Sequence, residues 1–154
     1  MQLGAATVTA LIDAAKREML QAAAGSVLIV EDEAIIAMDL EHIAAGMGHR
    51  VTGIARTHAS AVSLAARDRP DLILADIQLA DKSSGIDAVK EILTRFDGLP
   101  VIFITAFPER LLTGQRPEPA FLITKPYTEE QIRSAVSQAM FFSSTETLSA
   151  APAA

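Results

Sequence analysis

Cysteine is absent from the 154-residue sequence, which excludes disulfide bonds, thiol catalysis and thiolate metal ligands. Any bound metal would need oxygen or histidine ligands. No stretch of about 18 apolar residues occurs. The amino-terminal segment, interrupted by Asp13 and by Lys16-Arg17-Glu18, does not have the pattern of a secretion signal. We therefore expect a cytoplasmic protein that does not bind a membrane.

Clusters of basic residues are also lacking. Lysine and arginine total 13 against 19 acidic residues, which gives a net charge of −6. Contacts to a phosphate backbone require Lys and Arg gathered on one surface, so we expect no nucleic-acid partner. The length and the 50% hydrophobic content fit one domain that is large enough to bury a core.

Short apolar runs alternate with helical patterns from Ser26 onward. Strands are predicted at Ser26–Val30, Arg50–Ala55, Asp71–Ala75, Pro100–Ile104 and Phe121–Thr124, and helices at about Ala34–Met47, Ala59–Arg69, Gly85–Phe96 and Thr128–Phe142. Before them, Ala5–Ala23 has apolar residues at helical spacing, which predicts an amphipathic helix that packs against another surface. The alternation indicates an α/β fold, a doubly wound parallel sheet with helices on both faces.

The turn after the first predicted strand, Glu31-Asp32-Glu33-Ala34, contains no glycine. It therefore lacks the loop that cradles a dinucleotide or a nucleoside triphosphate. Asp76 follows the third strand and Lys125 follows the fifth. Because parallel strands end at the same edge of a sheet, Glu31, Asp32, Asp76 and Lys125 should share one crevice. Three carboxylates and an ammonium group suit a divalent cation and a phosphoryl group.

Four segments together resemble the response-regulator receiver domain: Val27–Glu33, Asp71–Asp76, Val101–Ala106 and Leu122–Tyr127. They occur in the expected order and spacing within residues 26–142. The resemblance implies a flavodoxin-like (βα)5 fold whose five-stranded parallel sheet has the order 2-1-3-4-5. It also implies a regulator of two-component signal transduction that is not an enzyme, apart from catalysing its own phosphorylation and dephosphorylation.

The resemblance also assigns roles to individual residues. Asp76 corresponds to the phosphoacceptor, with a histidine kinase or a phosphotransfer protein as the donor. The implied metal ion, Mg²⁺ or Mn²⁺, would be bound by Glu31, Asp32, Asp76 and the backbone carbonyl of Gln78. The phosphoryl group and the switch would involve Thr105, Ala106 and Lys125. Pro126 is the candidate for a cis peptide bond.

Taken singly, most of these residues have ordinary structural explanations. Asp32 or Glu33 could cap the following helix, and a lone Asp76 could be a loop acid. Only their combination with Lys125 favours a phosphoryl site. The three histidines, His42, His49 and His58, are expected on the surface or at helix ends, with no role as ligands or in phosphotransfer.

Two departures from the receiver pattern concern the output surface. Leu122 stands three residues before Lys125, where an aromatic switch residue is expected. Between Thr105 and Lys125, four helix-breaking residues leave room for only one or two helical turns: Pro108, Gly114, Pro117 and Pro119. We therefore expect a short or remodelled fourth receiver helix. The predicted output face comprises Phe107, Leu111, Leu112, Phe121 and Tyr127.

This remodelled segment and the ending Ala-Phe-Leu-Ile-Thr-Lys-Pro-Tyr resemble the receivers of PhyR-type regulators of alphaproteobacterial general stress responses. In that family a sigma-like domain precedes the receiver, and phosphorylation frees it to capture an anti-sigma factor. Residues 1–25 would then be a linker helix or a remnant of the sigma-like domain, residues 26–142 the receiver, and residues 143–154 a disordered tail.

Other functions stay open at this level. A stand-alone receiver could act as a phosphate shuttle or sink, or as an interaction module without phosphorylation. A homodimer is a further possibility. An enzyme of the haloacid-dehalogenase type is disfavoured, because Gln78 replaces the second acid of its Asp-x-Asp motif.

Overall fold

Five parallel strands form one sheet in the order β2-β1-β3-β4-β5, which confirms the predicted topology. The structure is a computed structural model that describes residues 4–22, 24–111 and 120–149. The elements are α1 (Ala5–Ala22), β1 (Ser26–Val30), α2 (Ala34–Gly46), β2 (Arg50–Ala55), α3 (His58–Arg67), β3 (Leu72–Ala75), α4 (Gly85–Arg95), β4 (Val101–Thr105), the 3₁₀ helix η1 (Pro108–Leu111), β5 (Ala120–Thr124) and α5 (Glu129–Ser149).

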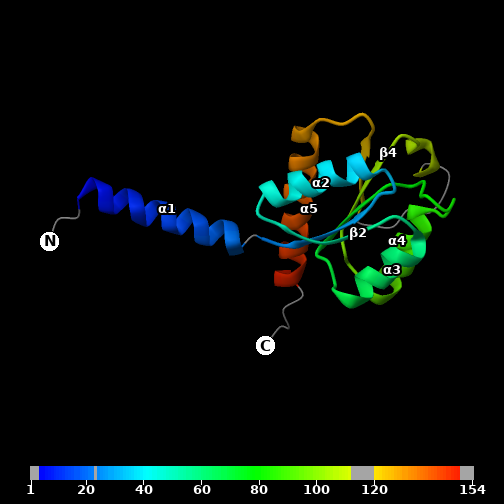
Figure 1. Cartoon of the computed structure of the whole chain (residues 1–154). Helices are drawn as coiled ribbons and strands as arrows, with labels where there is room; N and C mark the ends of the chain where they lie inside the picture. The colour runs from blue at the N-terminus through cyan, green and yellow to red at the C-terminus, as the bar shows by residue number, and fades with distance from the viewer. Residues whose placement is uncertain (1–3, 23, 112–119, 150–154) are drawn as a thin grey trace.

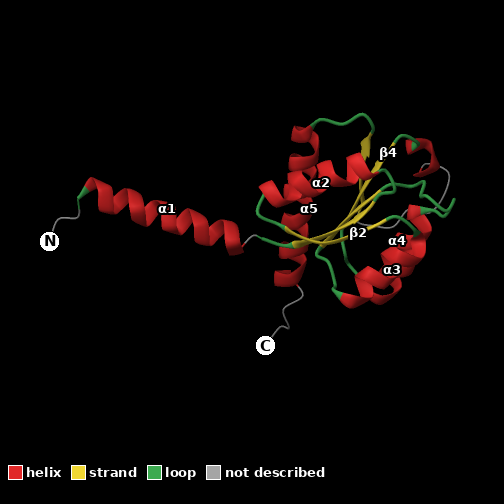
Figure 2. Ribbon diagram, viewed as in Figure 1, coloured by secondary structure: helices red, strands yellow, loops and turns green. Residues whose placement is uncertain are grey.

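The sheet lies between two layers of helices (Figures 1 and 2). All residues of β1, β3 and β4 are buried, as expected for parallel strands covered on both faces. Alternate residues of β1 supply two cores. Val27 and Ile29 pack on the side of α2 and α5, and Leu28 and Val30 pack on the side of α3 and α4.

Local capping residues set the ends of the helices. Gly48, with a φ of 88°, follows the end of α2, where a left-handed residue favours glycine. At the start of α5, the Thr128 amide donates to Gln131 Oε1 (2.8 Å) and the Gln131 amide donates to Thr128 Oγ1 (3.2 Å). This reciprocal pair is a capping box.

The connection between β4 and β5, where the fourth helix of a receiver is expected, contains no regular α-helix in its described part. After Thr105 the chain makes only the four-residue η1, as the prolines predict. Leu111 ends η1 and is buried in the α3/α4 core, with 5% of its surface exposed. Residues 112–119, including the predicted output residue Leu112, lie outside the described residues.

The two ends of the chain differ from expectation. Helix α5 continues to Ser149, so the predicted disordered tail from Ser143 is wrong over most of its length. No proline or glycine interrupts residues 143–149, and a helix already begun adds residues at low cost. At the other end, α1 is helical but extends away from the sheet (Figure 1), and Val8, Leu11 and Ile12 of its apolar stripe are exposed. In this structure the stripe is therefore not packed as expected.

Gly85 brings the start of α4 against the backbone of Asp76. Its amide donates to Ile77 O at 2.6 Å, and an added Cβ would lie 1.7 Å from Asp76 O. Only glycine fits this approach, which anchors the loop that follows the candidate phosphoacceptor.

The substitution Gly85→Ala should therefore lower the free energy of unfolding by about 1–3 kcal/mol through overpacking. Gly46→Ala is the matched control, because the nearest atom to its added Cβ is Arg133 Nη1 at 4.0 Å. That change should be neutral or stabilising by up to about 1 kcal/mol. Urea unfolding measures both, and equal effects of the two substitutions would contradict the close approach.

Candidate functional site

Three carboxylates meet at the carboxyl edge of the sheet. Glu31 and Asp32 follow β1, and Asp76 follows β3. The Glu31 amide donates to Ala55 O (2.9 Å) and the Asp76 amide donates to Val30 O (2.8 Å), so the hydrogen-bonding pattern of the strands positions both residues. One oxygen from each of the three carboxylates lies within 4.8 Å of the others. The structure thus brings together the acidic residues predicted from the sequence.

Lys125 reaches the same cluster from the end of β5. Its amide donates to Thr105 O at 2.8 Å, and its peptide bond to Pro126 is cis. The Nζ atom donates to Glu31 Oε1 at 2.7 Å and to Asp76 Oδ2 at 2.9 Å. One ammonium group therefore bridges two buried carboxylates.

Burial and repulsion control the charge of Glu31. Its burial raises the pKa of its carboxyl group, the nearby Asp76 carboxylate adds to the rise, and the hydrogen bond from Lys125 opposes it; the resulting pKa is about 7. For Lys125 burial disfavours the charged form, but the bonds to Glu31 and Asp76 prevail and raise its pKa. Lys125 therefore stays charged, while Glu31 exchanges a proton near neutral pH.

Asp76 is buried, with 8% of its surface exposed. Its Oδ1 accepts the Ile77 amide hydrogen at 2.7 Å, and its Oδ2 accepts from Lys125. Thr105, at the end of the neighbouring strand β4, is buried, and its Oγ1 accepts from the Phe107 amide at 3.0 Å. The hydroxyl keeps its own hydrogen to donate to a newly bound oxygen.

The remaining predicted site residues flank this cluster. Glu33 occupies the N-cap position of α2 without a side-chain cap bond, so a capping role does not account for its acidic side chain. Gln78 pairs with Ser84 in a β-bridge. Ala106 follows Thr105 and is exposed. The roles of Gln78 as a carbonyl ligand and of Ala106 as a phosphoryl contact stay predictions.

The described members of the predicted output face lie in different environments. Phe107 is 39% exposed and lies beneath the Arg110 guanidinium, whose carbon is 5.4 Å from the ring centre. Phe121 is half-buried against the α2/α5 core. Leu111 is a core residue, so its assignment to a contact face is wrong; its burial holds η1 against the sheet.

Tyr127 makes a contact that the sequence pattern does not reveal. Its hydroxyl donates to Asp39 Oδ2 on α2 at 2.8 Å. Burial and the Asp39 carboxylate raise the pKa of Tyr127, so the hydroxyl stays protonated and can donate. Tyr127 comes two residues after Lys125, which ties the end of β5 to α2. A sequence signal exists for Tyr127, since it ends the Lys-Pro-Tyr motif, but not for Asp39.

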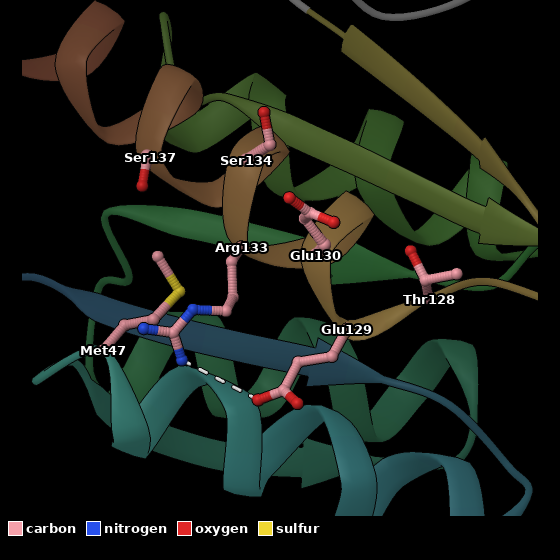
Figure 3. A pocket seen from close by; sticks show the side chains of 7 residues that line it. All are labelled: Met47, Thr128, Glu129, Glu130, Arg133, Ser134 and Ser137. Atoms are coloured by element: carbon pink, nitrogen blue, oxygen red, sulfur yellow. Dashed lines mark ion pairs between the residues drawn. The ribbon is translucent and has the colours of Figure 1, made fainter.

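A shallow cavity of about 600 Å³ lies apart from the acidic cluster. Figure 3 shows Met47, the residue after α2, facing residues of α5, with Glu129 and Arg133 forming an ion pair at 3.7 Å. None of its lining residues belongs to the carboxylate cluster. We therefore place the candidate phosphoryl site at the strand ends and not in this cavity.

Comparisons with known proteins identify the family. Residues 27–137 match the response regulator receiver domain. The chain belongs to the response-regulator receiver family. It is 57% identical over 133 residues to the phyllosphere-induced regulator PhyR of Methylorubrum extorquens strain AM1; the match covers 86% of this chain and 49% of that protein. The chain thus spans about half the length of this relative.

Solved structures of PhyR proteins share the fold. The solution structure of the Erythrobacter litoralis PhyR receiver is 53% identical, with a TM-score of 0.74, and the match covers 85% of this chain and 96% of that one. Bartonella quintana PhyR in complex with the anti-sigma factor NepR is 54% identical, with a TM-score of 0.59, covering 91% of this chain and 57% of that one. The flavodoxin-like receiver fold and the resemblance to PhyR are confirmed.

The donor set of this receiver fits a hard divalent cation. All three converging side chains offer carboxylate oxygens, which Mg²⁺ prefers. Receivers are regulators and not metabolic enzymes.

Among the described helices, none has the length and apolar composition needed to cross a membrane.

The pKa of Glu31 predicts how stability depends on pH when no divalent cation is bound. Because folding raises this pKa from its ordinary 4.5 to about 7, the folded state binds the proton more tightly. The contribution of Glu31 protonation to the free energy of unfolding is therefore complete below pH 4.5 and is lost as the pH rises through 7. At about 1.4 kcal/mol per pKa unit, the free energy of unfolding falls by roughly 2–3 kcal/mol between pH 5 and pH 8.

Urea unfolding in EDTA at pH 5 and pH 8 tests this dependence. Relative to Glu31→Gln, the wild-type receiver should become less stable at pH 8 than at pH 5 by that amount. Glu41→Gln, a change at an exposed residue of α2, is the control and should follow the wild type. A constant difference between wild type and Glu31→Gln would contradict the raised pKa.

Proposed function

We propose that this receiver is phosphorylated on Asp76 by a histidine kinase or a phosphotransfer protein in the cytoplasm. The phosphorylated form would control a general stress response through a sigma-like output domain that binds an anti-sigma factor. The observation that carries the proposal is the buried cluster in which Lys125 bridges Glu31 and Asp76. Three carboxylates and one ammonium group at a sheet edge suit a divalent cation and a phosphoryl group.

The residues present can carry the transfer. An Asp76 oxygen would attack phosphorus and form an acyl phosphate, while the bond from phosphorus to the donor breaks and its electron pair leaves with the donor. Bound Mg²⁺, held by Glu31, Asp32, Asp76 and the Gln78 carbonyl, would neutralise phosphoryl charge. Lys125 Nζ and the Thr105 hydroxyl would contact the remaining oxygens, so catalysis consists of positioning and charge stabilisation.

A protein donor is supported by apolar side chains near the site. Ile35 and Met38 lie one helical turn apart on α2, a few residues after Asp32, and are 84% and 65% exposed. Large apolar side chains exposed side by side favour a docking surface. We place the kinase or phosphotransfer protein over this part of α2, where its phosphorylated side chain can approach Asp76.

The output partner is proposed from the relatives and from the surface of α5. The Bartonella quintana protein forms a complex with an anti-sigma factor, and we extend that partner to this chain. A groove of about 620 Å³ runs between β5 and α5 and includes Leu122, which is 38% exposed. We propose this groove as the face that a sigma-like domain contacts.

Exposure to acetyl phosphate with Mg²⁺ should add the mass of one phosphoryl group to the intact chain. Asp76→Asn should abolish the gain, because the amide is a poor nucleophile, and EDTA should abolish it in the wild type. Asp87→Asn, a change at an exposed acid on α4, is the control and should label normally. Labelling of Asp76→Asn would refute the phosphoacceptor assignment.

Amide hydrogen exchange on the same labelled samples separates the possible outputs. Altered protection of β5 and α5 supports a receiver that signals through the β5–α5 groove. Changes confined to the loops after β1 and β3 would instead support a stand-alone shuttle or sink. Normal binding of an anti-sigma partner by Asp76→Asn would support an interaction module that works without phosphorylation.

A further inference from the structure

Arg56 stands beside the acidic cluster at the carboxyl edge of the sheet. The Glu31 amide donates to Ala55 O at 2.9 Å, and the Asp76 amide donates to Val30 O at 2.8 Å. In a parallel ladder, a residue whose amide donates to a carbonyl lies level with the residue after that carbonyl. Glu31 is therefore level with Arg56 and Asp76 with Glu31, which continues the register of the preceding residues. Arg56, Glu31 and Asp76 form one row across the ends of β2, β1 and β3.

This row places Arg56 close enough to act on the site through its charge. Neighbouring strands lie about 4.8 Å apart, so the backbones of Arg56 and Asp76 are separated by roughly 10 Å. The loop that follows Asp76 also returns to Arg56, because the Ala80 amide donates to Arg56 O at 3.3 Å. At low ionic strength a charge at this distance is only weakly screened by salt.

The guanidinium group of Arg56 is not committed to a structural role. Arg56 is exposed, and among the residues that the structure describes none forms an ion pair or a hydrogen bond with its side chain. By contrast, Arg50 at the other end of β2 is paired with Asp68 at 2.6 Å. Lys125 is bound to two carboxylates. Arg56 thus remains free to attract an anion from solution.

A phosphodonor must approach a site that is rich in negative charge. The carboxylates of Glu31, Asp32 and Asp76 outnumber the ammonium group of Lys125, and a small donor such as acetyl phosphate is itself an anion. A bound divalent cation lowers this repulsion. A guanidinium group in the same row lowers it further, because it is always charged and attracts phosphate oxygens.

We propose that Arg56 attracts the anionic phosphodonor to the entrance of the site. The inference rests on the proposed function, since it requires Asp76 to accept a phosphoryl group. Arg56 takes no part in making or breaking bonds. Its charge raises the rate at which the donor reaches Asp76.

The rate of labelling by acetyl phosphate with Mg²⁺, followed by intact mass at donor concentrations far below saturation, tests this role. At low ionic strength Arg56→Gln should be labelled about two- to fivefold more slowly than the wild type, the effect of one unit charge on a doubly charged anion at roughly 10 Å in water. At about 1 M salt, where the screening length is about 3 Å, the two rates should converge.

Two further variants show whether the charge itself is responsible. Arg56→Lys keeps the positive charge and should react like the wild type. Arg95→Gln, the same change at an exposed arginine in the last turn of α4, is the control and should also keep the wild-type rate. If Arg56→Lys were as slow as Arg56→Gln, the effect would not come from charge and the proposal would be overturned.

Titration with Mg²⁺ alone measures the reach of the same charge without phosphorylation. Removing a positive charge near the carboxylates strengthens their attraction for the ion, so Arg56→Gln should bind Mg²⁺ about two- to fivefold more tightly than the wild type at low ionic strength. Arg95→Gln should bind it equally. Unchanged Mg²⁺ affinity in Arg56→Gln would refute the inference. Normal labelling of Arg56→Gln would refute it too but leave the proposed function intact, whereas an unlabelled wild type would refute both.

Discussion

The ammonium group of Lys125 between the carboxylates of Glu31 and Asp76 is the interaction on which the site depends. Without a cation, buried carboxylates a few Å apart would repel one another and take up protons. Lys125 Nζ contacts both at less than 3 Å. To bring these groups together the sheet must place the ends of β1, β3 and β5 at one edge, which the order β2-β1-β3-β4-β5 achieves. The parallel topology is thus a requirement of the charge cluster.

The same strands connect this cluster to two distant surfaces. Beyond β5, Lys125 is followed by Tyr127, which is bonded to Asp39 on α2. At the other end of β1, Ser26 and Gly25 are held by Asp71 and His49. A displacement of Lys125 would therefore act first on Tyr127 and its contact with α2.

Most of the fold and the centre of the site could be predicted from sequence, because their signals are local. Buried parallel strands appear as apolar runs, and Glu31, Asp32, Asp76 and Lys125 each follow such a run. The remaining features depend on contacts between distant segments. Leu111 is buried because η1 folds onto the α3/α4 core, and Asp39 matters only because Tyr127 reaches it. Continuation of α5 to Ser149 escaped prediction because small polar residues favour disorder in composition but do not break a helix already begun.

Calorimetric titration of Mg²⁺ tests most directly whether Lys125 balances the charge of the cluster. If the Lys125 ammonium group neutralises part of the negative charge of the three carboxylates, removing it should strengthen their attraction for Mg²⁺. Lys125→Met should then bind Mg²⁺ more tightly than the wild type. The two proteins should be compared at a pH above the Glu31 pKa of about 7, where the Mg²⁺ affinity no longer changes with pH because protons do not compete with the metal. Lys90→Met, a change at an exposed lysine of α4, should bind like the wild type. Equal or weaker Mg²⁺ binding by Lys125→Met at that plateau would contradict the account.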